Sequence, residues 1–409
     1  MHRTTSSATV VAVAAAAALA LSACSDAAPT SPPLPVTDVG ALPSPVWASQ
    51  AIGETGPGST YALYVPHRWN GEAVFYGHGI IVPGSPVALP VNDSIAQMRD
   101  SLGARGYAVA YSSFSETGWA VKDGAQRTHQ LRGIFASRFG QPVRSYLAGH
   151  SMGGLIAQQL AEQFPQQYDG TLALCAPLAG GVAEIDYLAN VRVLFDHFYA
   201  GVMPGDALNV PAGLDLVADV RVPVAMAVTA SPYGMLAIAS TKQTPLAGIN
   251  GGEWATSLIY ALSYNVVGTP DMLARTHDHS FFDNSATTYV PGAAPLLPPV
   301  MLAPMLAGAN LHADRFTATP DASHYLTQHY TPTGALARPT VTLHTSRDPL
   351  VPIFHERAFA DAVTAAGEGD LLVQRTVTGF GHCAFAVNDV LSAFDALAGW
   401  VRGGAKPAP

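Results

Sequence analysis

The chain has 409 residues, of which 49% are hydrophobic and 12% are charged, and its formal net charge is −9. This length allows one large domain or a domain with an insertion, and the composition allows a substantial core. The negative charge, without clusters of basic residues, argues against nucleic acid or an anionic membrane surface as a partner.

The N-terminal residues are expected to be a targeting segment rather than part of the fold. His2 and Arg3 precede an apolar, alanine-rich run from Val10 to Leu21, and Ser22-Ala23-Cys24 follows. The run is too short to span a membrane and is typical of a secretory signal, which we assign to residues 1–23. No other stretch of the chain is long and apolar enough to span a bilayer.

A small-residue cleavage site that ends in cysteine resembles the lipobox of bacterial lipoproteins. The resemblance implies that Cys24 is lipidated, and an ordinary signal peptide with an incidental Cys24 is the alternative. Residues 24–39 are rich in Pro and Ser and are expected to form a flexible tether. We therefore expect an exported protein, anchored in the cell envelope only through a lipid on Cys24, or secreted if Cys24 is not lipidated.

Strand and helix patterns alternate in residues 40–179, the first part of the main domain. Alternation of this kind predicts a mostly parallel sheet with helices on both faces, an α/β fold. Asn70-Gly71 is the predicted turn between the first two strands. The expected strands are Ser59–Val65, Ala73–Tyr76, Tyr107–Ser112, Val143–Ala148 and Gly170–Pro177, and the expected helices are Gly124–Phe139 and Met152–Phe164.

The alternation stops in residues 180–338, where helix-like runs (Tyr187–Ala200, Trp254–Val267) are separated by Pro/Gly-rich breaks. A segment of this length is too long for a loop and predicts an inserted, mainly helical cap. Most of its aromatic residues are expected to lie in the core of the cap. The α/β pattern resumes in residues 339–409, with strands at Thr340–Thr345 and Leu371–Val377 and helices at Pro352–Ala366 and Val387–Val401.

The motif Gly149-His150-Ser151-Met152-Gly153 lies between a predicted strand and a predicted helix. A sharp, strained turn in this setting projects the serine hydroxyl, and glycines two residues away leave room for the close backbone. Ser151 is therefore the predicted nucleophile. His150 is adjacent, but neighbouring side chains on such a turn point in different directions.

A serine hydroxyl needs a base, and the base needs an orienting acid. His382 follows the last predicted strand and precedes the last helix, so a loop can carry it back over Ser151. Asp348 follows the penultimate strand and is the predicted acid, although Asp-Pro is also a common turn. Two other histidines, His344 and His355, fall inside a predicted strand and a predicted helix.

Acyl transfer also needs donors for the developing oxyanion. The backbone N–H of Met152, at the start of a helix, is one expected donor, and Gly79 or Ile80 in the glycine-rich loop that follows the expected strand Ala73–Tyr76 is the other. Residues expected near the substrate pocket are His78, His150, Phe114 and Trp119. His277 and His279 lack further ligands at a recognisable spacing, so no metal site and no cofactor are expected.

Three segments resemble the α/β-hydrolase fold superfamily, in particular its capped esterase-, lipase- and peptidase-like members. They are Gly-His-Ser151-Met-Gly-Gly, Arg-Asp348-Pro-Leu-Val-Pro and Gly-His382-Cys, in the chain order serine, aspartate, histidine. The resemblance covers about Val46–Pro177 and Pro339–Val401. It implies an eight-stranded sheet with Ser151 after strand five, Asp348 after strand seven and His382 after strand eight, and a cap inserted after strand six.

Two cysteines remain after Cys24, and they could form one disulfide or stay as buried thiols. Tannase- and feruloyl-esterase-like members of the superfamily bond the cysteine after the catalytic histidine to a cysteine just before the serine. His150 occupies that position here, so this pairing is unavailable. Cys175, at the end of the adjacent strand, is the substitute partner that we expect for Cys383.

The sequence thus predicts a serine hydrolase that cleaves small-molecule or polymeric carboxylic esters, without a cofactor and without nucleic acid as a partner. The alternatives are a peptidase or amidase of the same fold, such as a prolyl aminopeptidase-like enzyme, and a non-catalytic, hydrolase-like binding lipoprotein. An apolar, aromatic cap favours the ester, but a fold does not determine its substrate.

Overall fold

The computed structural model describes residues 46–90 and 93–409. The predicted signal segment (1–23), the predicted tether (24–39) and Cys24 lie outside the described residues.

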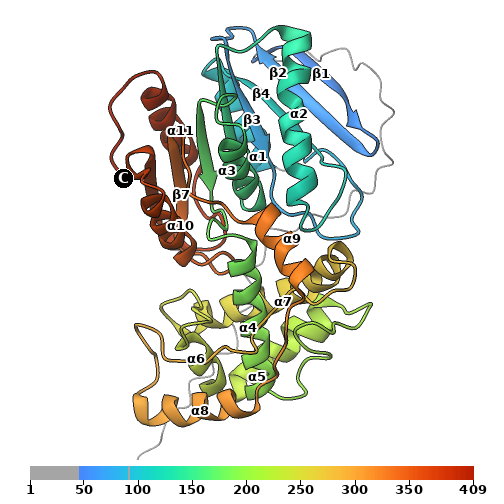
Figure 1. The fold of residues 1–409 in the computed structure, drawn as a ribbon, viewed down its shortest axis with the longest axis vertical. Helices are drawn as coiled ribbons and strands as arrows, with labels where there is room; N and C mark the ends of the chain where they lie inside the picture. Colours follow the sequence, from blue (N-terminus) through green and yellow to red (C-terminus); the bar gives the residue numbers. More distant parts are fainter. Residues whose placement is uncertain (1–45, 91–92) are drawn as a thin grey trace, which may run out of the picture. The chain divides into compact units, whose positions relative to one another are not determined.

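An eight-stranded sheet forms the centre of the main domain, in the order β1-β2-β4-β3-β5-β6-β7-β8 (Figure 1). β2 pairs antiparallel with β1 and β4, and all other neighbours are parallel. The carboxyl ends of β3, β4, β5, β6, β7 and β8 therefore meet at one edge of the sheet. The strands are β1 (Trp47–Gly56), β2 (Ser59–Pro66), β3 (Glu72–Gly77), β4 (Ala108–Ser112), β5 (Arg144–His150), β6 (Gly170–Leu174), β7 (Thr340–Arg347) and β8 (Leu372–Phe380).

Helices cover both faces of this sheet because side chains of successive strand residues point to opposite faces. In β5, Leu147 packs into the apolar cluster with α2 and α3, whereas Tyr146 and Ala148 pack into the cluster with α1 and α11. α10 packs on a smaller cluster with Ala173 of β6. These helices are α1 (Asp93–Ala104), α2 (Val121–Phe139), α3 (Met152–Gln163), α10 (Phe354–Ala365) and α11 (Val387–Val401), with a short 3-10 turn, η2 (Gly369–Leu371), before β8.

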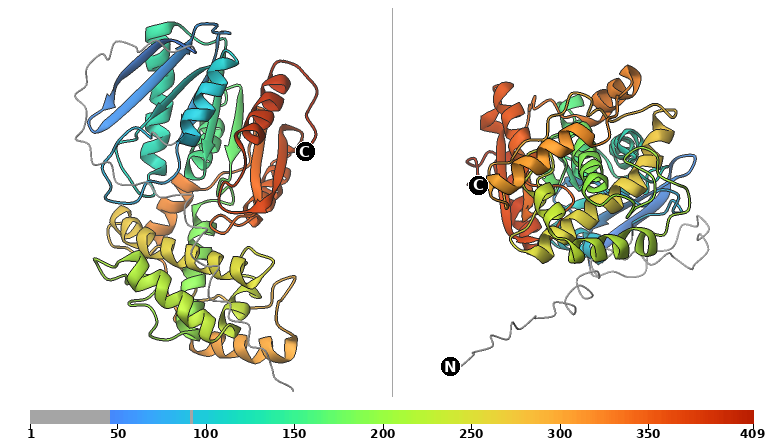
Figure 2. Two further views of the ribbon diagram at one scale, coloured as in Figure 1. Left: turned by 180° about the vertical axis from the view of Figure 1, so that it is seen from behind. Right: turned by 90° about the horizontal axis from the view of Figure 1, so that it is seen from below.

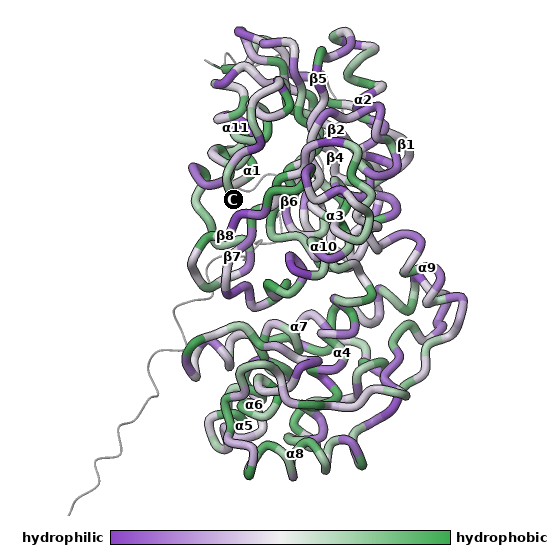
Figure 3. Tube along the Cα trace, turned by 60° about the vertical axis from the view of Figure 1, so that its left-hand side comes forward, coloured by the Kyte–Doolittle hydropathy of each residue, from purple (hydrophilic) through white to green (hydrophobic). Residues whose placement is uncertain are grey.

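The chain between β6 and β7 forms a helical cap (Figures 1 and 2). Apolar side chains of α4, α6, α7, α8 and α9 are buried in one cluster that continues into the α2–α3 layer. α5 and α6 are mostly hydrophobic in sequence (Figure 3). The cap elements are α4 (Gly181–Phe198), η1 (Leu216–Arg221), α5 (Val222–Ala230), α6 (Tyr233–Ala239), α7 (Gly251–Arg275), α8 (Pro299–His312) and α9 (Pro320–Tyr330).

Among the described residues, no single helix is long and apolar enough to cross a membrane. The helical segments Leu216–Ala230 and Tyr233–Ala239 are long and apolar enough only when they are taken together, and the chain bends by 104° between them.

The predicted fold class is confirmed: an eight-stranded, mostly parallel sheet with helices on both faces and a helical insertion after β6. Some details differ. β1 and α1 were not predicted, and β6 ends at Leu174, before the predicted Pro177. The strands on either side of Asn70-Gly71 do not pair with each other, because β4 lies between β2 and β3.

Candidate active site

Ser151 occupies the turn from β5 into α3 with φ 54° and ψ −126°, a conformation that costs energy for any residue with a side chain. The flanking glycines permit this turn. A Cβ atom at Gly149 would collide with the carbonyl of Gly153, and one at Gly153 would collide with the carbonyl of Gly77. The backbone therefore presents the serine on a strained turn, as the motif predicts.

His382 and Asp348 form a hydrogen-bonded chain with Ser151. His382 Nε2 lies 2.9 Å from Ser151 Oγ, and His382 Nδ1 lies 2.7 Å from Asp348 Oδ2. Asp348 is completely buried, and its Oδ1 accepts the N–H groups of Leu350 and Val351, both at 2.9 Å. These two donors and His382 hold the carboxylate in one orientation behind the imidazole.

Each of these three residues follows the strand expected of it. Ser151 follows β5, Asp348 follows β7 and His382 follows β8, so the three loops converge at the carboxyl edge of the sheet. This strand order, with a nucleophile turn after β5, decides the fold. The chain has the α/β-hydrolase fold.

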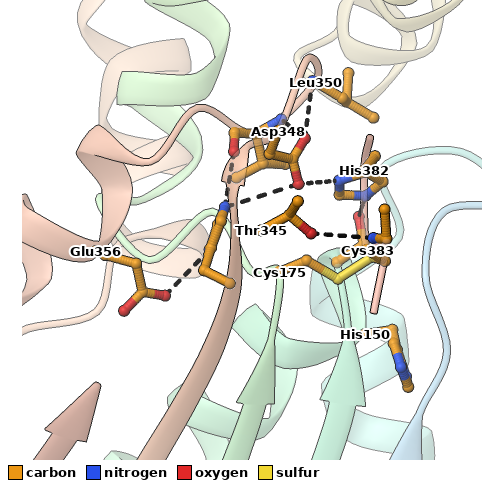
Figure 4. The surroundings of a disulfide bond; sticks show 12 residues. His150, Cys175, Thr345, Asp348, Leu350, Glu356, His382 and Cys383 are labelled. Atoms are coloured by element: carbon orange, nitrogen blue, oxygen red, sulfur yellow. Dashed lines mark hydrogen bonds and ion pairs between the residues drawn. A yellow bond between two sulfur atoms is a disulfide. The ribbon is translucent and has the colours of Figure 1, made fainter. Parts of the chain in front are cut away.

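A disulfide lies directly beside His382 in this α/β-hydrolase site (Figure 4). It joins Cys175, just after β6, to Cys383, with a Cα–Cα distance of 5.3 Å. This is the pair expected from the position of Cys175 at the end of the adjacent strand. The N–H of Ala384 also donates to Thr345 Oγ1 at 3.0 Å, so β6 and β7 both hold the loop that carries His382.

The loop after β3 faces the nucleophile. A Cβ atom at Gly79 would lie 3.4 Å from Ser151 Cβ, and Ile80 lines the same cavity as Ser151. Met152 is the first residue of α3, and the first N–H groups of a helix have no partner within it. The position of these groups suits the predicted oxyanion donors, whose role stays a prediction.

A cavity opens above Ser151 between the sheet and the cap. The main domain contributes residues from five loops, and α4 and α7 of the cap supply most of the remaining wall. The wall is mainly apolar and aromatic, with few polar side chains. The lining residues are Ile80, Trp119, Ser151, Pro177, Glu184, Ile185, Leu188, Ala189, Tyr264, Asn265, Gly268, Thr269, Met272, Phe281, Leu350 and Val351.

Of the four residues expected near the substrate pocket, only Trp119 is part of this wall. His78 and Phe114 are buried and stack on each other, with ring centroids 3.8 Å apart, so they belong to the interior and not to the cavity wall. His150 points away from the cavity, and its Nδ1 lies 3.0 Å from Tyr76 Oη. Burial, with a smaller effect of nearby His382, lowers the pKa of His150 to about 4.

A residue that the sequence analysis missed, Glu184 on α4, lies in the cavity wall although it is 3% exposed. His355 Nδ1 accepts the N–H of Ala179 at 3.1 Å, so its proton is on Nε2, which donates to Glu184 Oε2 at 2.8 Å. Burial, together with the charge of Asp348, raises the pKa of Glu184 well above its ordinary value. An acidic residue in the first turn of a largely apolar helix was the only signal in the sequence.

α7 is tied to the main domain at both ends. At its C-terminal end, Arg275 donates to Glu116 Oε2 and to the carbonyl of Thr117, both at 2.7 Å. Asp271, one turn earlier, accepts the backbone N–H of Trp119 at 2.6 Å. At the other end, Arg347 Nε lies 3.0 Å from Glu253 Oε2. These contacts hold α7 over the cavity.

His277 and His279 lie on an exposed turn after α7. Within the described part of the chain, the one cluster of three potential metal-ligating residues is Cys175, His382 and Cys383, and its two sulfurs are bonded to each other.

No family model matches the chain. The o-phthalyl amidase of Xanthobacter agilis is 20% identical over 406 residues, which cover 85% of this chain and 86% of the amidase. Among solved structures, feruloyl esterase B from Aspergillus oryzae has a TM-score of 0.47 at 16% identity, covering 87% of this chain and 82% of the esterase. Est1E from Butyrivibrio proteoclasticus has a TM-score of 0.41 at 12% identity, covering 87% and 99%. These similarities are too low to identify a substrate.

Proposed function

We propose that this protein is a serine hydrolase that cleaves carboxylic esters through an acyl-enzyme intermediate. The observation that carries the proposal is the hydrogen-bonded chain from Ser151 through His382 to Asp348 beside an apolar cavity. Nucleophile, base and orienting acid are each within hydrogen-bond distance of the next, which is the geometry that such catalysis needs.

In the proposed first half-reaction, Ser151 Oγ attacks the ester carbonyl carbon while His382 Nε2 takes the hydroxyl proton. The carbonyl oxygen becomes an oxyanion, which the N–H of Met152 and the N–H of Gly79 or Ile80 stabilise. The tetrahedral intermediate collapses, the C–O bond to the leaving group breaks, and His382 gives its proton to the departing alkoxide.

In the second half-reaction, water attacks the acyl group on Ser151 and His382 removes a proton from this water. Collapse of the second intermediate releases the carboxylic acid, and the proton returns to Ser151 Oγ. Asp348 stays ionised throughout, holds the imidazole in one tautomer and stabilises the imidazolium. Every proton transfer uses a group of this chain or water.

The cavity wall supports an apolar or aromatic acyl group. Trp119, Tyr264 and Phe281 provide flat aromatic surface, whereas Glu184 and Asn265 are among the few polar side chains in the wall. Such a pocket gains affinity mainly by removing apolar surface from water.

Amide hydrolysis is the second candidate function. It is favoured by the similarity to the o-phthalyl amidase, which extends over most of both chains. The same three residues can cleave an amide, because His382 can protonate an amine leaving group in place of an alkoxide.

We also propose that the protein is exported and held in the cell envelope by a lipid on Cys24. The support is the signal-like apolar run and the Leu-Ser-Ala-Cys24 sequence. Secretion without lipidation is the alternative.

A matched pair of substrates tests the reaction. The purified protein is assayed with a p-nitrophenyl ester and with the p-nitroanilide of the same aromatic acyl group. We expect a higher kcat/KM for the ester, and a loss of about 10⁴-fold or more in Ser151→Ala. The control, Ser137→Ala, changes an exposed serine of α2 and keeps full activity. Faster release from the anilide would establish the second candidate, and turnover that survives in Ser151→Ala would refute both.

A further inference from the structure

A second histidine lies on the far side of Asp348 from His382. His344 is in β7 and is 0% exposed. Its Nδ1 lies 3.1 Å from Glu356 Oε1, and its Nε2 lies 2.8 Å from the carbonyl oxygen of Val351. Neither a carboxylate nor a carbonyl oxygen can donate, so both ring nitrogens must carry protons. The surroundings of His344 thus hold it as an imidazolium.

Glu356, on α10, accepts hydrogen bonds from three side chains. Its Oε2 accepts a hydrogen bond from the Thr342 hydroxyl and another from Gln374 Nε2, which is 2.6 Å away. With His344 on Oε1, three donors converge on one buried carboxylate. Glu356 and His344 therefore make a buried ion pair.

The same imidazolium approaches the catalytic acid. His344 Nε2 lies 3.7 Å from Asp348 Oδ2, the oxygen that faces His382 Nδ1 at 2.7 Å. Asp348 thus lies between two imidazole rings, one of which is the proposed base. Figure 4 shows Glu356, Asp348 and His382 in this arrangement.

We propose that His344 is a positioning residue whose buried positive charge balances Asp348, so that His382 stays an unprotonated base down to mildly acidic pH. This inference rests on the proposed function, because it concerns the base of that reaction. Asp348 alone would stabilise the protonated form of His382, which cannot accept the serine proton. A second cation beside Asp348 weakens that effect.

The other groups around His344 leave this charge in place. Glu184 on α4 and His355 on α10 are buried nearby, and burial favours the neutral form of each: it raises the pKa of Glu184 and lowers that of His355 to about 3. Burial also opposes the charge of His344, but Glu356 and Asp348 outweigh it and raise the pKa of His344. The charged groups facing one another are thus Glu356, His344 and Asp348, and His382 joins them when protonated.

The test combines histidine NMR with a pH profile. In the full-length protein labelled with ¹⁵N-histidine, the His344 signal, assigned through its loss in His344→Gln, should show two protonated ring nitrogens at neutral pH. In His344→Gln, His382 should titrate about one pH unit higher. The acid limb of the pH profile of kcat/KM for a p-nitrophenyl ester should shift to higher pH by the same amount.

Two further variants make the result decisive. His344→Gln alone leaves Glu356 buried without its cation, which can destabilise the fold. The double variant with His344→Gln and Glu356→Gln removes both charges and avoids this problem. The acid limb of its kcat/KM profile should also shift to higher pH. Thr342→Val removes an uncharged donor from the same network and should leave the acid limb in place.

A neutral His344 at neutral pH, or an acid limb that stays or moves down in both glutamine variants, would overturn the proposal. Failure of the proposed function is a different outcome: no variant would then turn over ester, while the NMR titrations of His344 and His382 would still report on their charges.

Discussion

At the scale of single residues, the site depends on side chains whose surroundings determine their protonation. Asp348 is buried and accepts two backbone N–H groups, so its carboxylate is held in a fixed position behind His382. His150 is adjacent to the nucleophile in sequence, yet it points toward Tyr76 and cannot replace His382 as the base. Proximity in sequence to Ser151 is therefore a poor guide to a catalytic role.

The low pKa of His150 predicts a pH-dependent loss of stability. Its pKa is about 4 in the folded protein, against an ordinary value of 6.5. Between these values the unfolded chain binds more protons at this position than the folded protein, so the free energy of unfolding falls as the pH decreases. We expect His150→Gln, which can still bond Tyr76, to reduce this fall by about 2 kcal/mol.

Urea unfolding of the wild type and His150→Gln between pH 6.5 and 4 measures this difference directly. His277→Gln, on an exposed turn, is the matched control and should unfold like the wild type across the same range. Identical pH dependence of the wild type and His150→Gln would show that His150 is not buried in its neutral form.

The sequence was sufficient to predict the residues whose type and position the proposed reaction restricts most. Ser151, Asp348 and His382 each follow a strand, and the glycines around Ser151 mark the turn. Glu184 and His344 could not be predicted in this way. The role of Glu184 depends on His355, which is more than a hundred residues away in the sequence. The role of His344 depends on how β7 and α10 pack together, which no local pattern encodes.

At the scale of helices and strands, α7 forms a large part of the wall on the cap side of the cavity. It contributes five residues to the cavity wall, and Arg275 ties its C-terminal end to the loop that carries Trp119. Loss of this contact should make the cavity wall more mobile, while Ser151, His382 and Asp348 keep their positions. Arg275 is 12% exposed and Glu116 is 52% exposed, so water partly screens the ion pair between them, and the bond from Arg275 to the Thr117 carbonyl adds a second charge-assisted contact.

We expect Arg275→Met to raise KM about 3–10-fold for an ester with an aromatic acyl group, with kcat nearly unchanged. Steady-state kinetics measure both constants. Arg68→Met, at an exposed arginine of the main domain, is the control and should behave like the wild type. A fall in kcat with unchanged KM would mean that α7 acts on the chemical step instead.

Sequence patterns were less informative for the elements of the cap. α7 continues to Arg275, beyond the predicted end at Val267, although Pro270 lies inside it. Proline removes one helix hydrogen bond, but buried Met272 and the ion pairs of Arg275 hold the last turns in place. α5 has apolar residues on all sides, so it lacks the one-sided periodicity that identifies a helix.

At the scale of the whole molecule, the described chain is a sheet that brings three loops to one edge and a cap that covers that edge. The sheet accounts for the proposed chemistry, since Ser151, Asp348 and His382 all follow its strands. Most of the cavity wall that would meet the acyl group comes from α4 and α7. The cap is therefore where selectivity between esters and amides, and between acyl groups, has to be sought.

The measurement that tests the central claim most directly is covalent labelling of the nucleophile. A fluorophosphonate loses fluoride to an activated serine and leaves a stable phosphonyl group on its oxygen. We predict one adduct, located by peptide mass spectrometry on Ser151, and its absence in Ser151→Ala. An unlabelled wild-type protein, or an adduct that persists in Ser151→Ala, would contradict the account.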